Sequence, residues 1–128
     1  CLFLNRSDIK EGLKTILKGI DQMKSGISMC IFPEGTRSES EDETQLLPFK
    51  EGSLKMAEKT GYPIVPMSIN NTRNIFEAHM PFIRSAHVIL EYGEPIYPKD
   101  LPKEQKKFLG AHCQEIIQNT VSKNQSLV

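Results

Sequence analysis

The sequence predicts an α/β fold in which a mainly parallel sheet is flanked by helices. Short apolar segments alternate with segments in which apolar residues recur every three or four positions, the patterns of buried strands and amphipathic helices. Right-handed crossovers between successive strands would place the helices on the faces of the sheet. A length of 128 residues is typical of one domain with a modest core, and no internal repeat indicates a second.

The first elements expected are a strand, a helix and a second strand. Residues 1–5 are short, apolar and aromatic, as in a buried strand. Ser7 or Asp8 can cap a helix that ends near Lys24. Its apolar stripe consists of Ile9, Leu13, Ile16, Leu17, Ile20 and Met23. Residues 27–32 are a continuous apolar run, which predicts a second buried strand.

A loop over residues 34–48 follows, because Pro33 stops the second strand. Its acidic run, residues 39–43, lacks the spacing of a calcium loop. We therefore expect this run to be solvated and mobile rather than a metal site. A short helix over residues 52–60, closed by Gly61, comes next.

The second half of the chain predicts two more strands and a long helix. Residues 62–69 form a strand that two prolines make short, bulged or an edge strand. Residues 70–85 have no clear pattern, and residues 87–92 alternate as a half-buried strand does. A final helix is expected over roughly residues 103–123. Its inward residues would be Phe108, Leu109, Cys113, Ile116, Ile117 and Val121.

Composition argues against several classes of protein. The formal net charge is zero, whereas nucleic-acid binders usually carry a basic excess. The three cysteines, Cys1, Cys30 and Cys113, are an odd number and contain no CxxC pair. This pattern argues against a disulfide scaffold or a zinc site and favours a reducing compartment. We expect Cys30 and Cys113 to be small core residues.

The most informative segment is Phe32-Pro33-Glu34-Gly35-Thr36-Arg37-Ser38. A strand ends there, Gly35 permits unusual backbone angles, and polar side chains follow at the carboxyl end of the strand, where ligands bind in α/β sheets. The guanidinium of Arg37 offers a planar set of donors for a phosphate or carboxylate. An ordinary turn with a surface salt bridge between Glu34 and Arg37 explains the same residues, and the segment alone leaves both interpretations open.

Two further cations could join this segment. Arg6 lies between a predicted strand and a helix N-terminus, a position that favours anions, although a solvated arginine paired with Asp8 is the plainer interpretation. Lys50 precedes the short helix and is weak evidence alone. The histidines His79, His87 and His112 have no Cys or Ser partner in the pattern. The chain thus offers anion-binding candidates without a general base.

These residues resemble the 1-acylglycerol-3-phosphate acyltransferases of the glycerolipid and lysophospholipid acyltransferase superfamily. That family carries four blocks, and the third is present letter for letter at residues 32–38. The second, an apolar strand ending in arginine, matches residues 2–6, and the fourth matches residues 64–66. The first block, His-x4-Asp, is absent, because Arg84, Tyr92 and Ile117 stand five positions after the three histidines. The resemblance therefore implies that residues 1–128 are the C-terminal portion of one glycerolipid acyltransferase-like domain, whose N-terminal part is missing.

The resemblance implies general-base acyl transfer, with the catalytic His and Asp outside this chain. It implies no metal and no cofactor, since acyl-CoA or acyl carrier protein is the donor substrate. The acceptor phosphate would be bound by Arg6, Glu34, Gly35, Thr36 and Arg37, with Lys50 and Pro66 in support. The glutamate would orient the arginine of the motif, a backbone amide or the acceptor hydroxyl.

The expected reaction converts lysophosphatidic acid to phosphatidic acid in phospholipid biosynthesis. Glycerol-3-phosphate or another lysophospholipid is an alternative acceptor, and a non-catalytic phosphate- or lipid-binding module is an alternative function. The resemblance also implies a membrane-associated protein at the cytoplasmic face, attached through the missing N-terminal region. The 128-residue chain alone is expected to be inactive.

Overall fold

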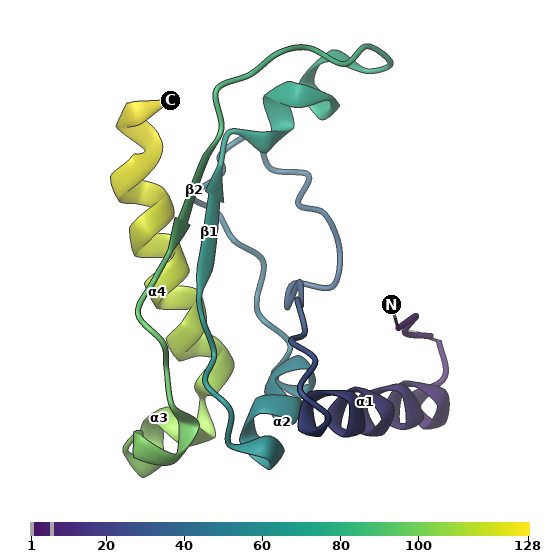
Figure 1. The fold of residues 1–128 in the computed structure, drawn as a ribbon. Helices are drawn as coiled ribbons and strands as arrows, with labels where there is room; N and C mark the ends of the chain where they lie inside the picture. The colour runs from purple at the N-terminus through teal and green to yellow at the C-terminus, as the bar shows by residue number, and fades with distance from the viewer. Residues whose placement is uncertain (1, 6) are drawn as a thin grey trace.

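A computed structural model describes residues 2–5 and 7–128, so Cys1 and Arg6 lie outside the described residues. Helices and strands follow one another along the chain as shown in Figure 1. They are α1 (Ile9–Lys24), α2 (Glu51–Thr60), β1 (Met67–Asn70), β2 (Ile89–Tyr92), α3 (Lys103–Lys107) and α4 (Leu109–Asn124). Short 3-10 helices are η1 (Thr72–Ile75), η2 (Glu77–His79), η3 (Pro98–Asp100) and η4 (Gln125–Leu127).

Helix α1 forms where the apolar periodicity predicted it. The carboxylate of Asp8 accepts the N–H of Lys10 at 2.8 Å, which confirms the predicted cap. The helix packs on α2. A Cβ on Gly19 would lie 2.6 Å from the sulfur of Met56, so a larger residue there would force the Met56 side chain to move. The apolar stripe of α1 is only partly covered by other residues: Ile20 is buried, whereas Ile9 is 89% exposed.

The sheet differs from the prediction. Strands β1 and β2 pair antiparallel, from Met67 opposite Tyr92 to Asn70 opposite Ile89, and an antiparallel bridge between Ile64 and Ile96 extends the pairing. A parallel arrangement needs a long crossover between the strands, usually a helix. The segment between β1 and β2 contains only short 3-10 helices, and the chain folds back antiparallel. Within the described part of the chain, the expected parallel sheet is therefore wrong.

The two N-terminal strands were also predicted incorrectly. Residues 2–5 and 27–32 belong to no ladder among the described residues. Phe3 is 89% exposed and Phe32 is 74% exposed, so neither segment is buried. Cys30 is exposed as well, which corrects its assignment to the core. Apolar character alone predicted these strands, but a strand forms only where a neighbour completes its hydrogen bonds.

The core lies between α2, the sheet and the C-terminal helices. It contains Leu54, Ile96, Leu109 and Cys113, with Phe49, Ile64, Leu101 and Ile116 packed against it. The expected helix over residues 103–123 is two helices, because the backbone breaks at Phe108 with φ −117° and ψ 46°. Phe108 is 57% exposed rather than inward.

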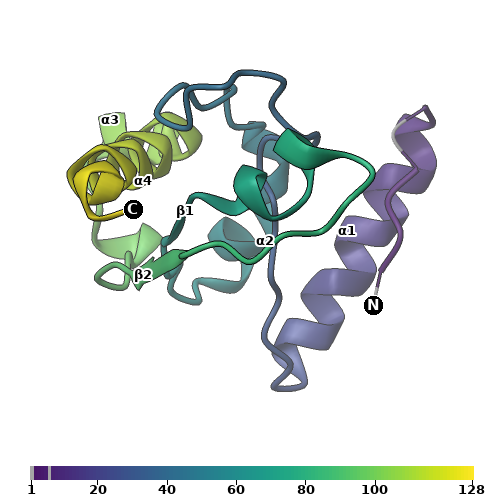
Figure 2. The same cartoon turned by 90° about the horizontal axis from the view of Figure 1, so that it is seen from above.

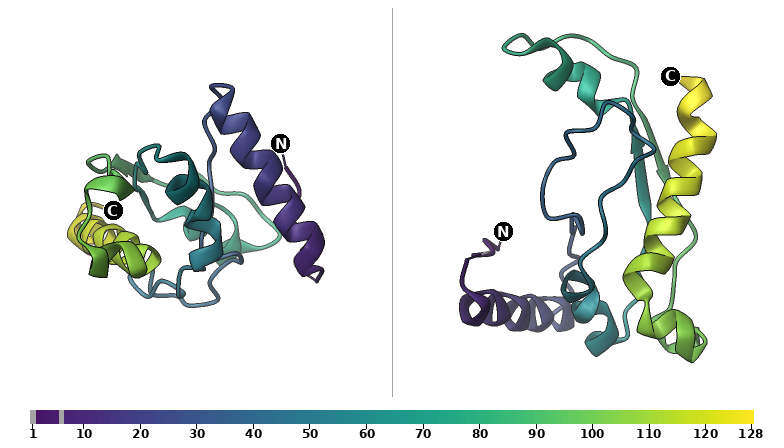
Figure 3. Two further views of the ribbon diagram at one scale, coloured as in Figure 1. Left: turned by 90° about the horizontal axis from the view of Figure 1, so that it is seen from below. Right: turned by 180° about the vertical axis from the view of Figure 1, so that it is seen from behind.

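Helix α4 lies along the sheet, whereas α1 lies on the opposite side of the molecule (Figure 2). Residues 33–50 run between these two sides, from the end where α1 meets α2 toward η1 and η2 (Figure 3). This segment, which we call the motif loop, carries residues 33–38 of the exact motif. Among the described residues, no helix has the length and apolar character that crossing a membrane requires.

Candidate anion-binding site

The motif begins with a tight turn that hydrogen bonds close. The N–H of Gly35 donates to the carbonyl of Phe32 at 3.1 Å, and the N–H of Lys50 donates to the carbonyl of Pro33 at 2.9 Å. Gly35 has φ +74°, a conformation that glycine adopts without strain. The second of these bonds joins the two ends of the motif loop, so the loop has a closed base.

Glu34 strengthens this base from inside the loop. Its carboxylate accepts the backbone N–H of Leu47 at 2.8 Å, across thirteen residues of chain. A backbone amide was one of the three partners expected for this glutamate. The alternative salt bridge between Glu34 and Arg37 is not formed, since Arg37 pairs with Glu77 at 3.6 Å. The two charged residues of the motif therefore face different partners.

The side chain of Arg37 is well placed to meet a ligand. It is 83% exposed, and its one ion pair in the described part of the chain, with Glu77, is long. Surface pairs of this kind contribute little, so an incoming anion can replace Glu77. Thr36 and Ser38 on either side are exposed and add hydroxyl groups.

The structure places Lys50 beside the motif. A Cβ on Gly35 would lie 3.0 Å from the Nζ atom of Lys50, so the lysine side chain passes directly over this turn. Pro66 is buried just before β1, and its carbonyl accepts the N–H of Gly93 at 2.8 Å. Arg6 lies outside the described residues, so its convergence with Arg37 stays a prediction.

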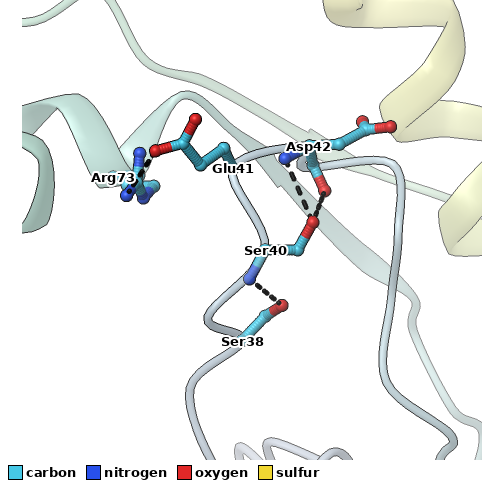
Figure 4. A network of polar contacts seen from close by, with 5 residues as sticks. All are labelled: Ser38, Ser40, Glu41, Asp42 and Arg73. Atoms are coloured by element: carbon cyan, nitrogen blue, oxygen red, sulfur yellow. Dashed lines mark hydrogen bonds and ion pairs between the residues drawn. The ribbon is translucent and has the colours of Figure 1, made fainter.

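The acidic segment after the motif is tied together by short-range bonds (Figure 4). The hydroxyl of Ser38 accepts the N–H of Ser40 at 3.2 Å, and the hydroxyl of Ser40 accepts the N–H of Asp42 at 3.1 Å. Hydrogen bonds from the hydroxyl and backbone N–H of Thr44 lower the pKa of Asp42. Glu41 pairs with Arg73 of η1 at 3.5 Å.

Glu43 corrects the expectation of a solvated run. Its carboxylate is half-buried and accepts hydrogen bonds from the side chain of Asn70 and the backbone of Asn71, at 2.8 and 2.6 Å. These partners lie 27 and 28 residues further along the chain. No local pattern reveals such a contact, which is why the sequence could not assign Glu43 a structural role.

A cavity of about 910 Å³ opens beside the motif. Glu34, Thr36 and Arg37 form part of its wall. The rest of the lining includes apolar residues of α1, α2, β1 and α4, among them Met23, Leu54, Met56, Ile69, Cys113 and Val121. The cavity thus offers both a polar wall and an apolar wall, the combination that an amphiphilic ligand requires.

The other reactive groups considered among the described residues are possible metal ligands and a buried thiol. Residues 2–5 and 7–128 contain no cluster of three His, Cys, Asp or Glu side chains that could hold a metal. Burial raises the pKa of the Cys113 thiol to about 11, helped by the charge of Glu51, so this thiol stays protonated near neutral pH. An unreactive thiol in the core agrees with its predicted structural role.

Comparison with known proteins assigns the chain to a family. A family model described as Acyltransferase matches residues 1–70. The 1-acyl-sn-glycerol-3-phosphate acyltransferase of Salmonella typhimurium is 31% identical over 122 residues, which are 94% of this chain and 48% of that protein. The enzyme of the same name from Borreliella burgdorferi is 43% identical over 81 residues, 63% of this chain and 31% of that protein.

A solved structure shows the same fold. The 1-acyl-sn-glycerophosphate (LPA) acyltransferase PlsC from Thermotoga maritima superimposes with a TM-score of 0.74 at 29% identity, covering 89% of this chain and 45% of that one. The chain thus has an acyltransferase fold and spans about half the length of several relatives it matches. With a family model matched over residues 1–70 of 128, the chain belongs to the Acyltransferase family.

Proposed function

We propose that the protein containing this chain transfers a fatty acyl group from a thioester donor to lysophosphatidic acid, giving phosphatidic acid in phospholipid biosynthesis. The observation that carries the proposal is the cavity beside the motif, which has Arg37, Thr36 and several carboxylates among its polar lining and apolar residues in the rest of its wall. Lysophosphatidic acid has a phosphate head and one acyl chain, which match the two kinds of wall. The names of the similar enzymes support this acceptor.

In the proposed reaction this chain binds the acceptor and the catalytic base comes from elsewhere in the protein. A His oriented by an Asp takes the proton of the acceptor hydroxyl, and the oxygen attacks the thioester carbonyl carbon. The carbon–sulfur bond breaks, and the thiol of coenzyme A or acyl carrier protein leaves. The proposed reaction needs no further cofactor. We also propose that the enzyme acts at the cytoplasmic face of a membrane.

Arg37 provides the test of the acceptor site. In the complete gene product, Arg37→Ala should raise the KM for lysophosphatidic acid at least about tenfold, because one charge-assisted hydrogen bond to phosphate is worth that much. Arg84→Ala is the matched control, since Arg84 is also exposed but does not line the cavity. Initial rates would be measured with acyl-CoA and with acyl carrier protein as donors.

A panel of acceptors separates the alternatives. Faster transfer to glycerol-3-phosphate, or to a lysophospholipid with a larger head group, would replace lysophosphatidic acid as the acceptor. Binding of lysophosphatidic acid without transfer from either donor would indicate a non-catalytic lipid-binding module. Equal KM values for the Arg37→Ala and Arg84→Ala variants would contradict the assignment of the phosphate site.

A further inference from the structure

Glu43 attaches the motif loop to the sheet. One carboxylate oxygen accepts the side-chain amide of Asn70 at 2.8 Å, and the other accepts the backbone N–H of Asn71 at 2.6 Å. Both oxygens of the Glu43 carboxylate therefore accept hydrogen bonds from residues at the end of β1. Hydrogen bonds to a charged group are stronger than those between neutral groups, so this attachment is firm.

Asn70 extends the attachment to the last helix. It is completely buried, and its amide nitrogen also donates to the backbone carbonyl of Val121 in α4 at 2.9 Å. Both amide hydrogens are thus in use, one toward the motif loop and one toward α4. The side-chain oxygen of Asn70 has no hydrogen-bond partner among the described residues. The amide orientation is fixed by its two acceptors rather than by its oxygen.

The other long-range side-chain contacts of the motif loop beyond its base are longer, including that from the Gln114 side chain of α4 to the carbonyl of Leu46 at 3.5 Å. Arg37 meets Glu77 at 3.6 Å and Glu41 meets Arg73 at 3.5 Å, and both pairs are largely exposed. A phosphate bound to Arg37 would compete with Glu77 for the guanidinium. The attachment through Glu43 does not involve Arg37.

We propose that Glu43 and Asn70 are positioning residues that hold the motif loop so that Arg37 faces the acceptor phosphate. This inference rests on the proposed function, because it assigns a role to the loop in acceptor binding. The local bonds from Ser38 to Asp42 transmit the attachment along the loop toward Arg37. Pre-organisation of this kind affects acceptor affinity more than the chemical step.

The test compares Glu43→Gln with Glu39→Gln in the complete gene product. Both substitutions remove one negative charge from the same loop, but the Glu39 side chain is exposed and forms no hydrogen bond among the described residues. We expect Glu43→Gln to raise the KM for lysophosphatidic acid about tenfold and to leave kcat within about twofold. Amide hydrogens of residues 36–47 should also exchange about tenfold faster, with α2 and α4 unchanged.

A paired substitution checks the contact itself. Asn70→Asp alone places two carboxylates together and should impair the enzyme more than Glu43→Gln does. In the double variant Glu43→Gln with Asn70→Asp, the new amide can donate to the new carboxylate, although the bond to the carbonyl of Val121 stays broken. We therefore expect the KM to be lower than in Asn70→Asp alone. If Asn70→Asp fails to fold, the comparison between Glu43→Gln and Glu39→Gln still decides the question.

Two results would overturn the inference. One is a Glu43→Gln variant that matches Glu39→Gln in both KM and amide exchange. The other is a global rise in exchange with equal losses in kcat and kcat/KM, which would make Glu43 a purely structural residue. Absence of transfer by the wild-type protein would instead refute the proposed function, and the exchange of residues 36–47 would still decide whether Glu43 holds the loop.

Discussion

Two neighbouring charged residues of the motif have separate tasks. Glu34 points into the loop and binds the backbone of Leu47, whereas Arg37 points outward and is 83% exposed. A carboxylate beside a phosphate would repel it, and its engagement with a backbone amide keeps its charge satisfied within the loop. Lys50 lies over Gly35 and adds positive charge at the same turn. The arrangement supports an anion site in spite of the glutamate.

Ionisation of the Cys113 thiol makes the free energy of unfolding depend on pH in the alkaline range. The pKa of this thiol is raised from 9.0 to about 11, first by burial and then by the charge of Glu51. A raised pKa in the folded state means that the stabilisation is complete below about pH 9 and is lost as the pH rises through 11. We therefore expect Cys113 alone to lower the free energy of unfolding by up to about 1.4 kcal/mol per pH unit in this window.

Urea unfolding at several pH values between 8 and about 11 would measure this effect. Cys113→Ala should reduce the slope of the unfolding free energy against pH by the contribution of about one proton, whatever its effect on stability at pH 8. Cys30→Ala is the control, since that thiol is exposed and its removal should leave the slope unchanged. Parallel curves for the wild type and Cys113→Ala would show that the thiol does not couple to folding.

At the scale of elements, Glu51 joins the beginnings of two helices. Both oxygens of its carboxylate accept the N–H of Gly110, at 3.0 and 3.1 Å, in the first turn of α4. In a continuous helix this N–H would bind the carbonyl four residues earlier, so the contact accompanies the break at Phe108. A Cβ on Gly110 would lie 2.5 Å from a carboxylate oxygen of Glu51, so a larger residue would displace the end of that side chain.

Glu51→Gln should lower the free energy of unfolding by about 1 kcal/mol, because it removes a negative charge from a helix N-terminus and weakens the hydrogen bond. It should also lower the pKa of Cys113, since the charge of Glu51 is one of its two causes. Glu115→Gln, on the exposed side of α4, is the matched control. Equal unfolding midpoints in urea for the two variants would contradict the role of Glu51 as a cap.

The sequence predicted helices better than strands, for a physical reason. The stripe and cap of α1 and the closing glycine of α2 are local features, and both helices appear close to their predicted bounds. Strand pairing depends on partners far along the chain, so residues 27–32 were apolar enough for a strand yet form no ladder in the described part. The motif can be read directly from the sequence. The role of Glu43, in contrast, depends on its contact with Asn70, 27 residues further along the chain.

At the scale of the whole molecule, several large apolar side chains are open to solvent. Phe3 and Ile9 are each 89% exposed, and Phe32 is 74% exposed. Several relatives are about twice as long as this chain, so the chain corresponds to about half of an enzyme of that kind.

The purified 128-residue chain should not transfer acyl groups to lysophosphatidic acid. None of the positions five residues after His79, His87 and His112 is an aspartate, so the sequence holds no His-x4-Asp pair to deprotonate the acceptor. Without a positioned base, the rate should fall by a factor of about 100 or more even if the acceptor binds. The complete gene product, assayed beside the chain with the same donors, serves as the positive control, and circular dichroism would verify that the chain is folded. Transfer by the folded chain at a rate within tenfold of the complete product would mean that its own residues supply the base, and the division of labour proposed here would be wrong.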